Sequence, residues 1–352
     1  MQRPPILSIT GMSLPELEAL CASMKEPVYR AKQILSWVYE KGATTFDCMS
    51  NLPKSFRTEM EKKCSLFQTR VDAVFRTDDN SEKFLIHLSD GNLIESVLLR
   101  EGKRITACVS SQVGCAMACR FCASGLLGLE KDLATGEIVE QLLHIKNRLL
   151  SGERITNVVF MGIGEPLANY GNVIGAIRII NAPWGTGIGS RHITLSTVGI
   201  PDGIRRLSRE GLQVNLAISL HAPSDAMRQQ IVPANKKTGI QAILAATQEY
   251  FKATGRDISF EYVLIDGVNS SKQDAGSLSR LLKGIQCNVN LLPVNPVEEF
   301  HLAAPDRETV EIFYETLQKY GIITTLRKRK GDNVHAACGQ LRIQNTNFYG
   351  KR

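Results

Sequence analysis

The sequence predicts an α/β protein built around a partial barrel of six β/α units, preceded by a small helical domain and a short β extension. The first observation is an alternation of strand-like and helix-like segments from about residue 105 onward, which is typical of a parallel sheet. The second is that polar and glycine residues gather just after these strands, where parallel α/β folds build their sites. The third is the length of 352 residues, which suffices for one large domain and an appendage.

Residues 1–66 are predicted to form a helical accessory domain. Ser13 followed by Glu16 has the pattern of a capping box, so a helix is expected to begin there. A second helix is expected after Pro27 and a third near Pro53. The third carries basic residues that make this domain a candidate for RNA docking, namely Lys54, Arg57, Lys62 and Lys63.

Residues 67–104 are predicted to form a β-rich linking extension. Three strand-like segments, RVDAVF, KFLIHL and LIESVLL, are separated by turn residues such as Asp90-Gly91-Asn92. The barrel is expected over residues 105–330, followed by a C-terminal loop and tail at 331–352. The barrel strands are expected at ITACVSS, ITNVVFM, HITLST, QVNLAISL, ISFEYVLI and CNVNLLP.

Composition indicates a soluble cytoplasmic protein. Hydrophobic residues make up 43% of the chain, no apolar run reaches membrane-spanning length, and the start, MQRPPILSIT, lacks the pattern of a signal peptide. Nine cysteines, an odd number, favour a reducing compartment over a disulfide framework. The net charge of +7 is expected of a protein that binds a polyanion, although each basic cluster taken alone is more typical of a solvated face.

Three cysteines in the run CAMACRFC are the most specific chemical signal. Cys115, Cys119 and Cys122 offer three thiolates from one short loop, without a fourth ligand at matching spacing. Structural zinc sites and most iron–sulfur clusters use four protein ligands, so a zinc site or buried free thiols are the less favoured alternatives. The spacing resembles that of the radical S-adenosylmethionine (SAM) superfamily, in which a [4Fe–4S] cluster keeps one iron open to chelate SAM.

Candidate ligands for SAM follow several of the expected strands. In the segment MGIGEPL, the glycines would allow close approach of a ligand, and Glu165 would face the ammonium group of SAM. Hydroxyl, imidazole and amide groups after later strands could hold its ribose and carboxylate. Taken singly each is more typical of a cap or loop, but their shared position at one mouth favours a site: Ser196, Ser219, His221 and Asn295.

Two further cysteines lie outside the CAMACRFC run. Cys108 sits in the first barrel strand, seven residues before Cys115, and Cys338 lies in the Gly-flanked segment VHAACGQ. Most free cysteines are simply buried. The positions of Cys108 and Cys338 favour a functional role, since Cys108 must emerge near the cluster and the loop of Cys338 could reach the mouth.

The whole chain closely resembles the RlmN-type branch of radical SAM enzymes, which are RNA adenine-C2 methyltransferases. The motifs that carry the resemblance are CVSSQVGC, MGIGEPL, STVGI, SLHAPSD, LLPVNP and AACGQL. The resemblance implies methylation of C2 of an adenosine in 23S rRNA, and in many members also of an adenosine in tRNA next to the anticodon. It implies that Cys115, Cys119 and Cys122 bind the cluster and that SAM is surrounded by Gly164, Glu165, Ser196, Ser219, His221 and Asn295.

The resemblance also implies a role for the two outer cysteines and for one carboxylate. Cys338 would accept a methyl group from one SAM, a second SAM would supply a radical, and Cys108 would resolve the covalent RNA adduct. A Cys108–Cys338 disulfide would remain, so a reductant is needed for it and for the cluster. Glu95 is the candidate base, since apolar neighbours in LIESVLL would tend to raise its pKa; the alternative is an edge-strand glutamate facing water.

Two competing interpretations remain. The sister branch methylates C8 of the same rRNA adenosine and tends to carry alanine after the Gly-Glu pair, whereas this chain has Pro166, which favours C2. A rival of another class is a non-catalytic, metal-bearing RNA-binding module. Formation of 5′-deoxyadenosine from SAM by the reduced protein would discriminate the two classes.

Overall fold

Ten strands form one continuous sheet in the computed structural model, which describes residues 7–126, 128–297, 299–327 and 339–341. The strands are β3 (Thr69–Arg76), β4 (Glu82–Leu88), β5 (Leu93–Glu101), β6 (Arg104–Cys108), β9 (Asn157–Phe160), β10 (Ile193–Thr197), β11 (Asn215–Ser219), β12 (Ile258–Leu264), β13 (Cys287–Pro293) and β14 (Ile323–Leu326). Their order is β14-β13-β12-β11-β10-β9-β6-β5-β4-β3. From β6 to β14 neighbouring strands are parallel, whereas β3 to β6 are antiparallel.

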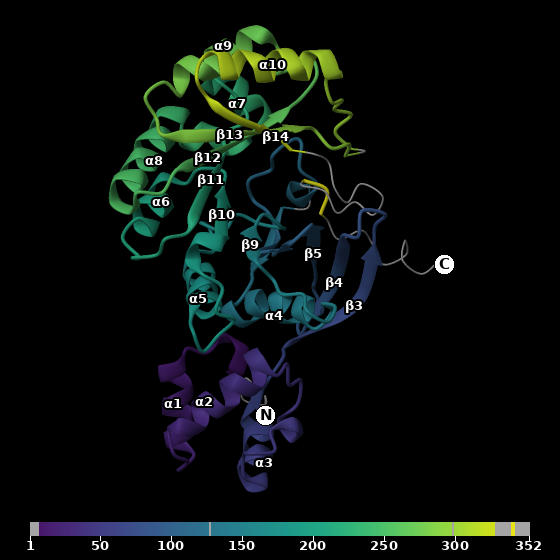
Figure 1. Ribbon diagram of the computed structural model, residues 1–352, viewed down its shortest axis with the longest axis vertical. Coiled ribbons are helices and arrows are strands. Elements are labelled where there is room, and N and C mark those ends of the chain that lie inside the picture. The colour runs from purple at the N-terminus through teal and green to yellow at the C-terminus, as the bar shows by residue number, and fades with distance from the viewer. Residues whose placement is uncertain (1–6, 127, 298, 328–338, 342–352) are drawn as a thin grey trace.

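Helices connect the parallel strands and cover the outside of the open barrel (Figure 1). They are α4 (Thr135–Lys146), α5 (Tyr170–Asn181), α6 (Pro201–Leu207), α7 (Asp225–Ile231), α8 (Ile240–Thr254), α9 (Lys272–Leu281) and α10 (Arg307–Lys319). The predicted α/β class, the partial barrel and its six strands are thereby confirmed. None of the helices in the described part of the chain has the length and apolar character needed to span a bilayer.

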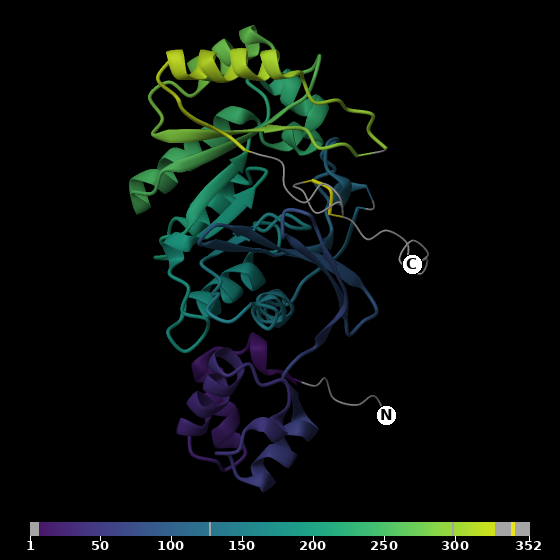
Figure 2. The same cartoon turned by 45° about the vertical axis from the view of Figure 1, so that its right-hand side comes forward.

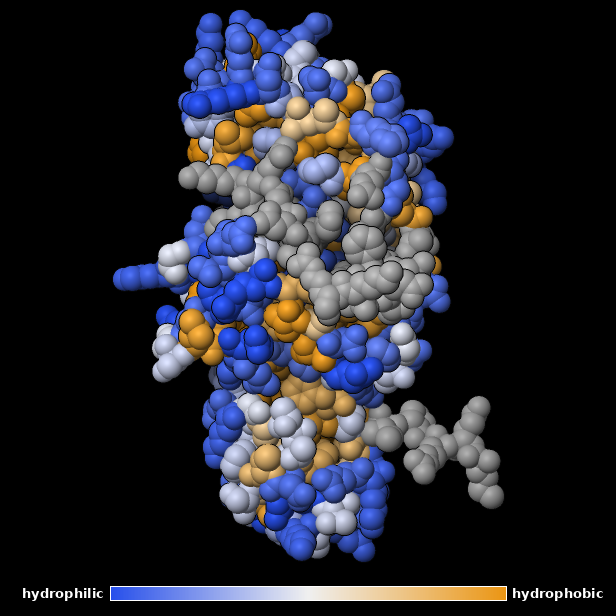
Figure 3. All heavy atoms as spheres, turned by 90° about the vertical axis from the view of Figure 1, so that its right-hand side faces the viewer, coloured by the Kyte–Doolittle hydropathy of each residue, from blue (hydrophilic) through white to orange (hydrophobic). Residues whose placement is uncertain are grey.

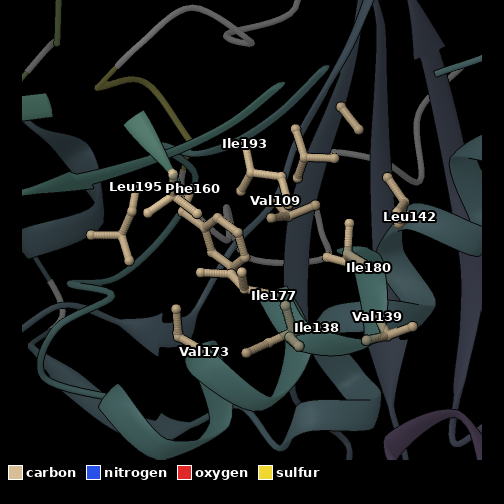
Figure 4. Close-up of a cluster of buried hydrophobic side chains, with 14 of the residues drawn as sticks. Val109, Ile138, Val139, Leu142, Phe160, Val173, Ile177, Ile180, Ile193 and Leu195 are labelled. Carbon is tan, nitrogen blue, oxygen red and sulfur yellow. The ribbon is translucent and has the colours of Figure 1, made fainter. Parts of the chain in front are cut away.

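The main hydrophobic core lies between this helical layer and the sheet. Figure 4 shows side chains of α4 and α5 meeting side chains of β9 and β10. The apolar positions of both helices recur at helical spacing, which turns one face of each toward the strands. The labelled members are Val109, Ile138, Val139, Leu142, Phe160, Val173, Ile177, Ile180, Ile193 and Leu195, all buried.

The N-terminal helices form a separate body beneath α4, at the opposite end of the molecule from β13 and β14 (Figures 1 and 2). They are α1 (Leu14–Ser23), α2 (Tyr29–Leu35) and α3 (Lys54–Lys63), which confirms the three predicted helices. Ser13 and Glu16 form the expected capping box, with the Ser13 amide donating to the carboxylate at 2.7 Å. Figure 3 shows hydrophobic residues at the narrow junction between this body and the barrel.

Glu140 of α4 joins the N-terminal body to the barrel. Its buried carboxylate accepts hydrogen bonds from the Thr10 hydroxyl at 2.6 Å and from the Thr69 amide and hydroxyl at 2.8 and 2.6 Å. Burial raises the pKa of this carboxyl, and the hydrogen bonds from Thr10 and Thr69 oppose the effect. Since Thr10 and Thr69 lie on either side of the helical body in the sequence, one side chain fixes both of its ends.

Two features depart from the expected organisation. The β extension is continuous with the barrel sheet, because β5 pairs with β6 from Val97 opposite Cys108 to Glu101 opposite Arg104. A seventh parallel strand, β14, pairs with β13 although the sequence prediction ended at six. This strand has only four residues and Ile323 is 71% exposed, so it lacks the apolar run by which the other strands were recognised.

Candidate active site at the mouth of the barrel

A cavity of about 980 Å³, open solvent at its mouth included, lies where the parallel strands end. Its wall is built from the loop that carries the three clustered cysteines, from the ends of β9 to β13, and from Gly339. The wall contains most of the predicted site residues, which the parallel arrangement brings together: Cys115, Cys119, Cys122, Gly164, Glu165, Ser196, Ser219, His221 and Asn295.

The cysteine loop is held on several sides by backbone hydrogen bonds. The Cys115 amide donates to the Gly128 carbonyl at 2.8 Å, and the Arg120 amide donates to the Ile231 carbonyl at 2.9 Å. Met117, Cys119 and Phe121 also pack against a buried apolar cluster formed by the ends of β10 to β13 and by α7. These contacts fix the loop to the barrel.

The three thiols lie in surroundings that disfavour their ionisation in the absence of a metal. Burial raises the pKa of Cys115 to about 12 and that of Cys119 well above its usual value, and the neighbouring cysteines add to both effects. Burial also raises the pKa of Cys122, against hydrogen bonds from Ser124. Iron binding would displace the thiol protons, so that the side chains would bind the metal as thiolates. Within the described ranges, no three His, Cys, Asp or Glu side chains converge as ligands of a single metal ion. The donor set, three thiols along the wall of a large cavity, fits a polynuclear cluster.

Glu165 is buried at the end of β9, so the solvated glutamate that a Gly-Glu-Pro turn usually carries is not what the structure contains. One carboxylate oxygen accepts the Val198 amide at 2.7 Å and the other accepts the Leu167 amide at 3.0 Å. Burial raises the pKa of this carboxyl, and the bond from Val198 is the largest effect opposing that shift. The backbone thus fixes Glu165 across two neighbouring strand ends, facing the cavity.

The glycines before Glu165 allow the chain to pack closely on itself. A Cβ atom at Gly162 would lie 2.6 Å from the Ser110 hydroxyl, and one at Gly164 would lie 2.6 Å from Gln112 Cβ. Gly164 also has a φ of +108°, which other residues rarely adopt. These glycines admit close packing of the chain on itself, and this contact places Gly164 in the cavity wall.

His221 is a neutral imidazole at the mouth. Burial and the nearby Arg228 guanidinium lower its pKa to about 3. Its Nδ1 accepts the Val263 amide at 3.0 Å, so the proton is on Nε2 and can be donated to a ligand. The ring also meets Phe121 edge-on, with centroids 4.6 Å apart, which links it to the cysteine loop.

Arg228 of α7 is a buried residue that the sequence analysis missed. Its guanidinium donates to the carbonyls of Ser219 and Leu220 at 2.9 and 3.0 Å, to the Val198 carbonyl, and to Asn235 Oδ1 at 2.6 Å. It therefore ties together the ends of β10 and β11, which carry predicted ligands. Burial lowers its pKa to about 10, so it remains a cation. Nothing in the sequence distinguishes this arginine from a surface residue of a short helix.

Glu261 of β12 was also missed, although the strand offered a signal. It is a carboxylate within the apolar segment ISFEYVL, it is buried, and it lines the cavity. Asn290 donates to it at 2.8 Å, and the Arg327 guanidinium lies 3.6 Å away. Burial raises its pKa, against the charge of Arg327. A charge inside an apolar strand is costly unless paired, which is why such residues mark sites.

Cys108 lies at the end of β6, buried to 7% exposure, opposite Val97 of β5 and Val159 of β9. Leu341 packs in the same apolar cluster. Cys338 lies outside the described residues, but the residues that follow it contact the cysteine loop and the cavity. The Ala123 amide donates to the Gly339 carbonyl at 2.7 Å, and the Ser124 hydroxyl donates to the Leu341 carbonyl at 2.8 Å.

Glu95 is fully buried on β5, which lies between β4 and β6 and is not an edge strand. The alternative of a glutamate facing water is therefore wrong. The prediction of apolar neighbours for Glu95 is also incomplete, because the Lys83 ammonium lies 2.9 Å from the carboxylate. The alternation rule placed Glu95 correctly on a strand face but could not identify the residue opposite it, since strand register is set by the fold.

Comparison with known proteins gives matches along nearly the whole chain. Residues 7–66 match the ribosomal RNA large subunit methyltransferase N-terminal domain, and residues 109–275 match the radical SAM superfamily. A probable dual-specificity RNA methyltransferase RlmN of Symbiobacterium thermophilum is 46% identical, over 95% of this chain and 91% of its own length. The corresponding protein of Rhodopirellula baltica is 43% identical, over 95% and 90% respectively.

A solved structure agrees with this fold. The crystal structure of a radical SAM methyltransferase from Sphaerobacter thermophilus superimposes with a TM-score of 0.94 at 42% sequence identity. The match covers 96% of this chain and 99% of that one, so it includes the N-terminal body, the antiparallel strands and the barrel together.

Proposed function

The chain belongs to the RlmN family of radical SAM RNA methyltransferases, and from this premise we propose that it methylates C2 of an adenosine in 23S rRNA and of an adenosine next to the anticodon in tRNA. The observation that supports this most is the placement of three cysteine thiols, a buried carboxylate and several strand-end polar groups around one cavity. The names of the relatives give a dual specificity toward RNA, which supports two substrates.

In this proposal the cofactors are a [4Fe–4S] cluster and SAM, and two SAM molecules are used in each turnover. Cys115, Cys119 and Cys122 would hold the cluster. Bound together and reduced, the two cofactors supply a 5′-deoxyadenosyl radical, which can activate a carbon–hydrogen bond. The fixed carboxylate of Glu165 would receive the ammonium group of SAM. Other groups of the wall would hold the remainder of the molecule: Gly164, Ser196, Ser219, His221 and Asn295.

We assign the covalent chemistry to the two outer cysteines. The Cys338 thiolate would displace the methyl group of one SAM, forming a sulfur–carbon bond as the sulfonium bond breaks. After that carbon has joined C2, the Cys108 thiolate would attack the Cys338 sulfur. A disulfide would then form as the sulfur–carbon bond breaks. The electron pair of that bond would stay on the methylene carbon, which takes up a proton to become the methyl group, and a reductant would restore both thiols. Glu95 would take the proton from C2.

Charge and organisation support RNA as the substrate. The net charge is +7, and the helical body carries the basic helix α3 at the far end from the cavity. We propose that residues 1–66 dock RNA while the barrel carries out the chemistry, with the loop at 331–352 presenting Cys338. An odd number of cysteines supports a reducing compartment, and hence the cytoplasm, as the place of action.

The test is mass spectrometry of digested RNA after incubation with reduced, cluster-loaded protein and SAM. Separate reactions with 23S rRNA and with bulk tRNA should each yield 2-methyladenosine. Formation of 8-methyladenosine alone would assign the protein to the sister activity. Absence of 5′-deoxyadenosine above a cluster-free control would contradict radical chemistry altogether.

A further inference from the structure

Lys83 and Glu95 form a buried ion pair in the antiparallel part of the sheet. The Lys83 ammonium lies 2.9 Å from the Glu95 carboxylate, with only 5% of the lysine side chain and none of the glutamate side chain exposed. Lysine and glutamate are almost never fully buried unless they are paired. Such a pair gives little net stability, because desolvation of both charges opposes their attraction. Its presence therefore calls for a reason other than stability.

The strand register places this pair on the face of the sheet that carries Cys108. Lys83 of β4 lies opposite Val97 of β5, and Val97 in turn lies opposite Cys108 of β6. Glu95 is two residues from Val97 on the same strand, so it shares that face. Diagonal neighbours in an antiparallel pair lie about 7–8 Å apart, within reach of long side chains. Lys83, Glu95 and Cys108 thus belong to one patch of the sheet.

Several described neighbours of Lys83 and Cys108 are apolar. The Phe75 ring lies opposite Lys83 on β3, with the ammonium 5.7 Å from the ring centroid. Val97, Val159 and Leu341 pack with Cys108 in one hydrophobic cluster. In such surroundings an isolated carboxylate would take up a proton to avoid burying its charge. An adjacent ammonium favours the ionised form.

We propose that Lys83 is a positioning residue that keeps Glu95 ionised and oriented to remove the C2 proton of the RNA adduct. The inference rests on the function proposed above. In the step, the unpaired electron that carbon–carbon bond formation leaves on the adenine would return to the oxidised cluster. The C2–H bond breaks, the proton passes to a Glu95 oxygen, and the electron pair of that bond restores the aromatic ring. Glu95 becomes a neutral acid beside an unchanged ammonium, and its proton passes to water before the next turnover. The lysine makes the carboxylate a weaker base, which suffices because C2 lies between two ring nitrogens and its proton is activated.

The test compares Lys83→Met and Lys83→Arg with the unsubstituted enzyme, using RNA with or without deuterium at adenosine C2. In Lys83→Met, 5′-deoxyadenosine should form at the unsubstituted level in the first turnover. Release of 2-methyladenosine should fall roughly 100-fold, the size of a typical general-base contribution. A covalent RNA–protein adduct that retains the C2 deuterium should accumulate, and a deuterium isotope effect on release should appear. Lys83→Arg keeps the charge and should restore most of the release.

A matched control is Arg100→Met, because Arg100 lies on the same strand as Glu95 but on the opposite face; the substitution breaks its ion pairs with Glu82 and Glu153. It should leave both products unchanged. If Lys83→Met does not fold, Lys83→Gln, which can still donate to Glu95 without a charge, should give the same adduct. Release at the unsubstituted rate, or an equal fall of both products without adduct, would overturn the proposal. An unsubstituted enzyme that forms neither product would instead refute the proposed function, whatever Lys83 does.

Discussion

The parallel and antiparallel halves of the sheet carry functional groups in different ways. In the parallel half, from β9 to β13, most of the groups lie at or just beyond the strand ends and converge on one cavity. In the antiparallel half, Lys83, Glu95 and Cys108 lie on the strands themselves and share a sheet face. The mouth suits cofactor binding, since loops can shape a large cavity. The face suits fixed side chains, because neighbouring strands hold them in register.

The difference suggests a division of labour. Groups at the mouth would start the reaction by binding the cluster and SAM, and groups on the face would finish it by removing the proton and releasing the product. The segment 339–341 contacts both halves, since Gly339 lines the cavity and Leu341 packs with Cys108. The halves therefore meet at the residues that follow Cys338.

The largest expected effect concerns the outer cysteines. Cys108→Ala should still form the carbon–carbon bond but should hold RNA covalently on the protein, because no thiolate attacks the Cys338 sulfur. Cys338→Ala should form neither product nor adduct, because the methyl carrier is absent. A denaturing gel of protein incubated with labelled RNA distinguishes these results.

The control for this experiment is Cys48→Ala, which removes an exposed free cysteine of the helical body. It should turn over normally. Normal turnover by Cys108→Ala would show that Cys108 is not needed for product release. The proposed division of roles between the two halves of the sheet would then be wrong.

The next effect concerns the frame of the mouth. Arg228→Met removes the donor to the carbonyls of Val198, Ser219 and Leu220. Leaving several buried carbonyls without a donor should lower the free energy of unfolding by about 3 kcal/mol or more. Urea unfolding measures this loss, and binding of SAM to the folded fraction should weaken as well.

Arg228→Lys should recover only part of the stability, because a lysine cannot span the same carbonyls with a planar fork. If Arg228→Met bound SAM as tightly as the unsubstituted protein, the guanidinium would stabilise the fold without positioning the groups that bind SAM.

The smallest effect should come from the junction between the helical body and the first residue of β3. Burial lowers the pKa of His144 to about 4, and its ring contacts the Thr69 hydroxyl at 2.8 Å. Because the unfolded histidine protonates near pH 6.5 and the folded one does not, its contribution is complete above pH 6.5. It is lost as the pH falls toward 4, at about 1.4 kcal/mol per pH unit at most.

Thermal unfolding of the protein and of His144→Phe between pH 4 and 7 isolates this contribution. As the pH falls from 7 to 4, the melting temperature of the histidine protein should decrease more than that of His144→Phe. Parallel curves over the whole range would show that His144 titrates alike in the folded and unfolded chains.

Sequence reasoning predicted the mouth well and the face poorly, for a physical reason. Parallel strands end at the same edge, so listing polar residues after each strand found Glu165, Ser219 and His221 without any coordinates. Residues on a face depend on register and on which strands are neighbours, and a shift by one residue reverses the face. Glu95 was found through its family segment, but its partner Lys83 was not.

The remaining omissions have similar causes. The contacts of Arg228 come from a helix that folds back over two strand ends, a long-range arrangement without a local pattern. β14 is short and exposed, so its pairing depends on β13 rather than on its own apolar residues. Glu261 could have been found, because a carboxylate inside an apolar strand is unusual enough to mark a site.

The division of labour is tested most directly by replacing one carboxylate in each half and measuring both products in single turnovers. Glu165→Gln should lose about 10- to 100-fold in SAM affinity and should form correspondingly little 5′-deoxyadenosine and 2-methyladenosine at limiting SAM. Glu95→Gln should form 5′-deoxyadenosine normally and almost no 2-methyladenosine. Normal 2-methyladenosine from Glu95→Gln, or normal 5′-deoxyadenosine from Glu165→Gln at limiting SAM, would contradict the assignment of the two halves to the start and the end of the reaction.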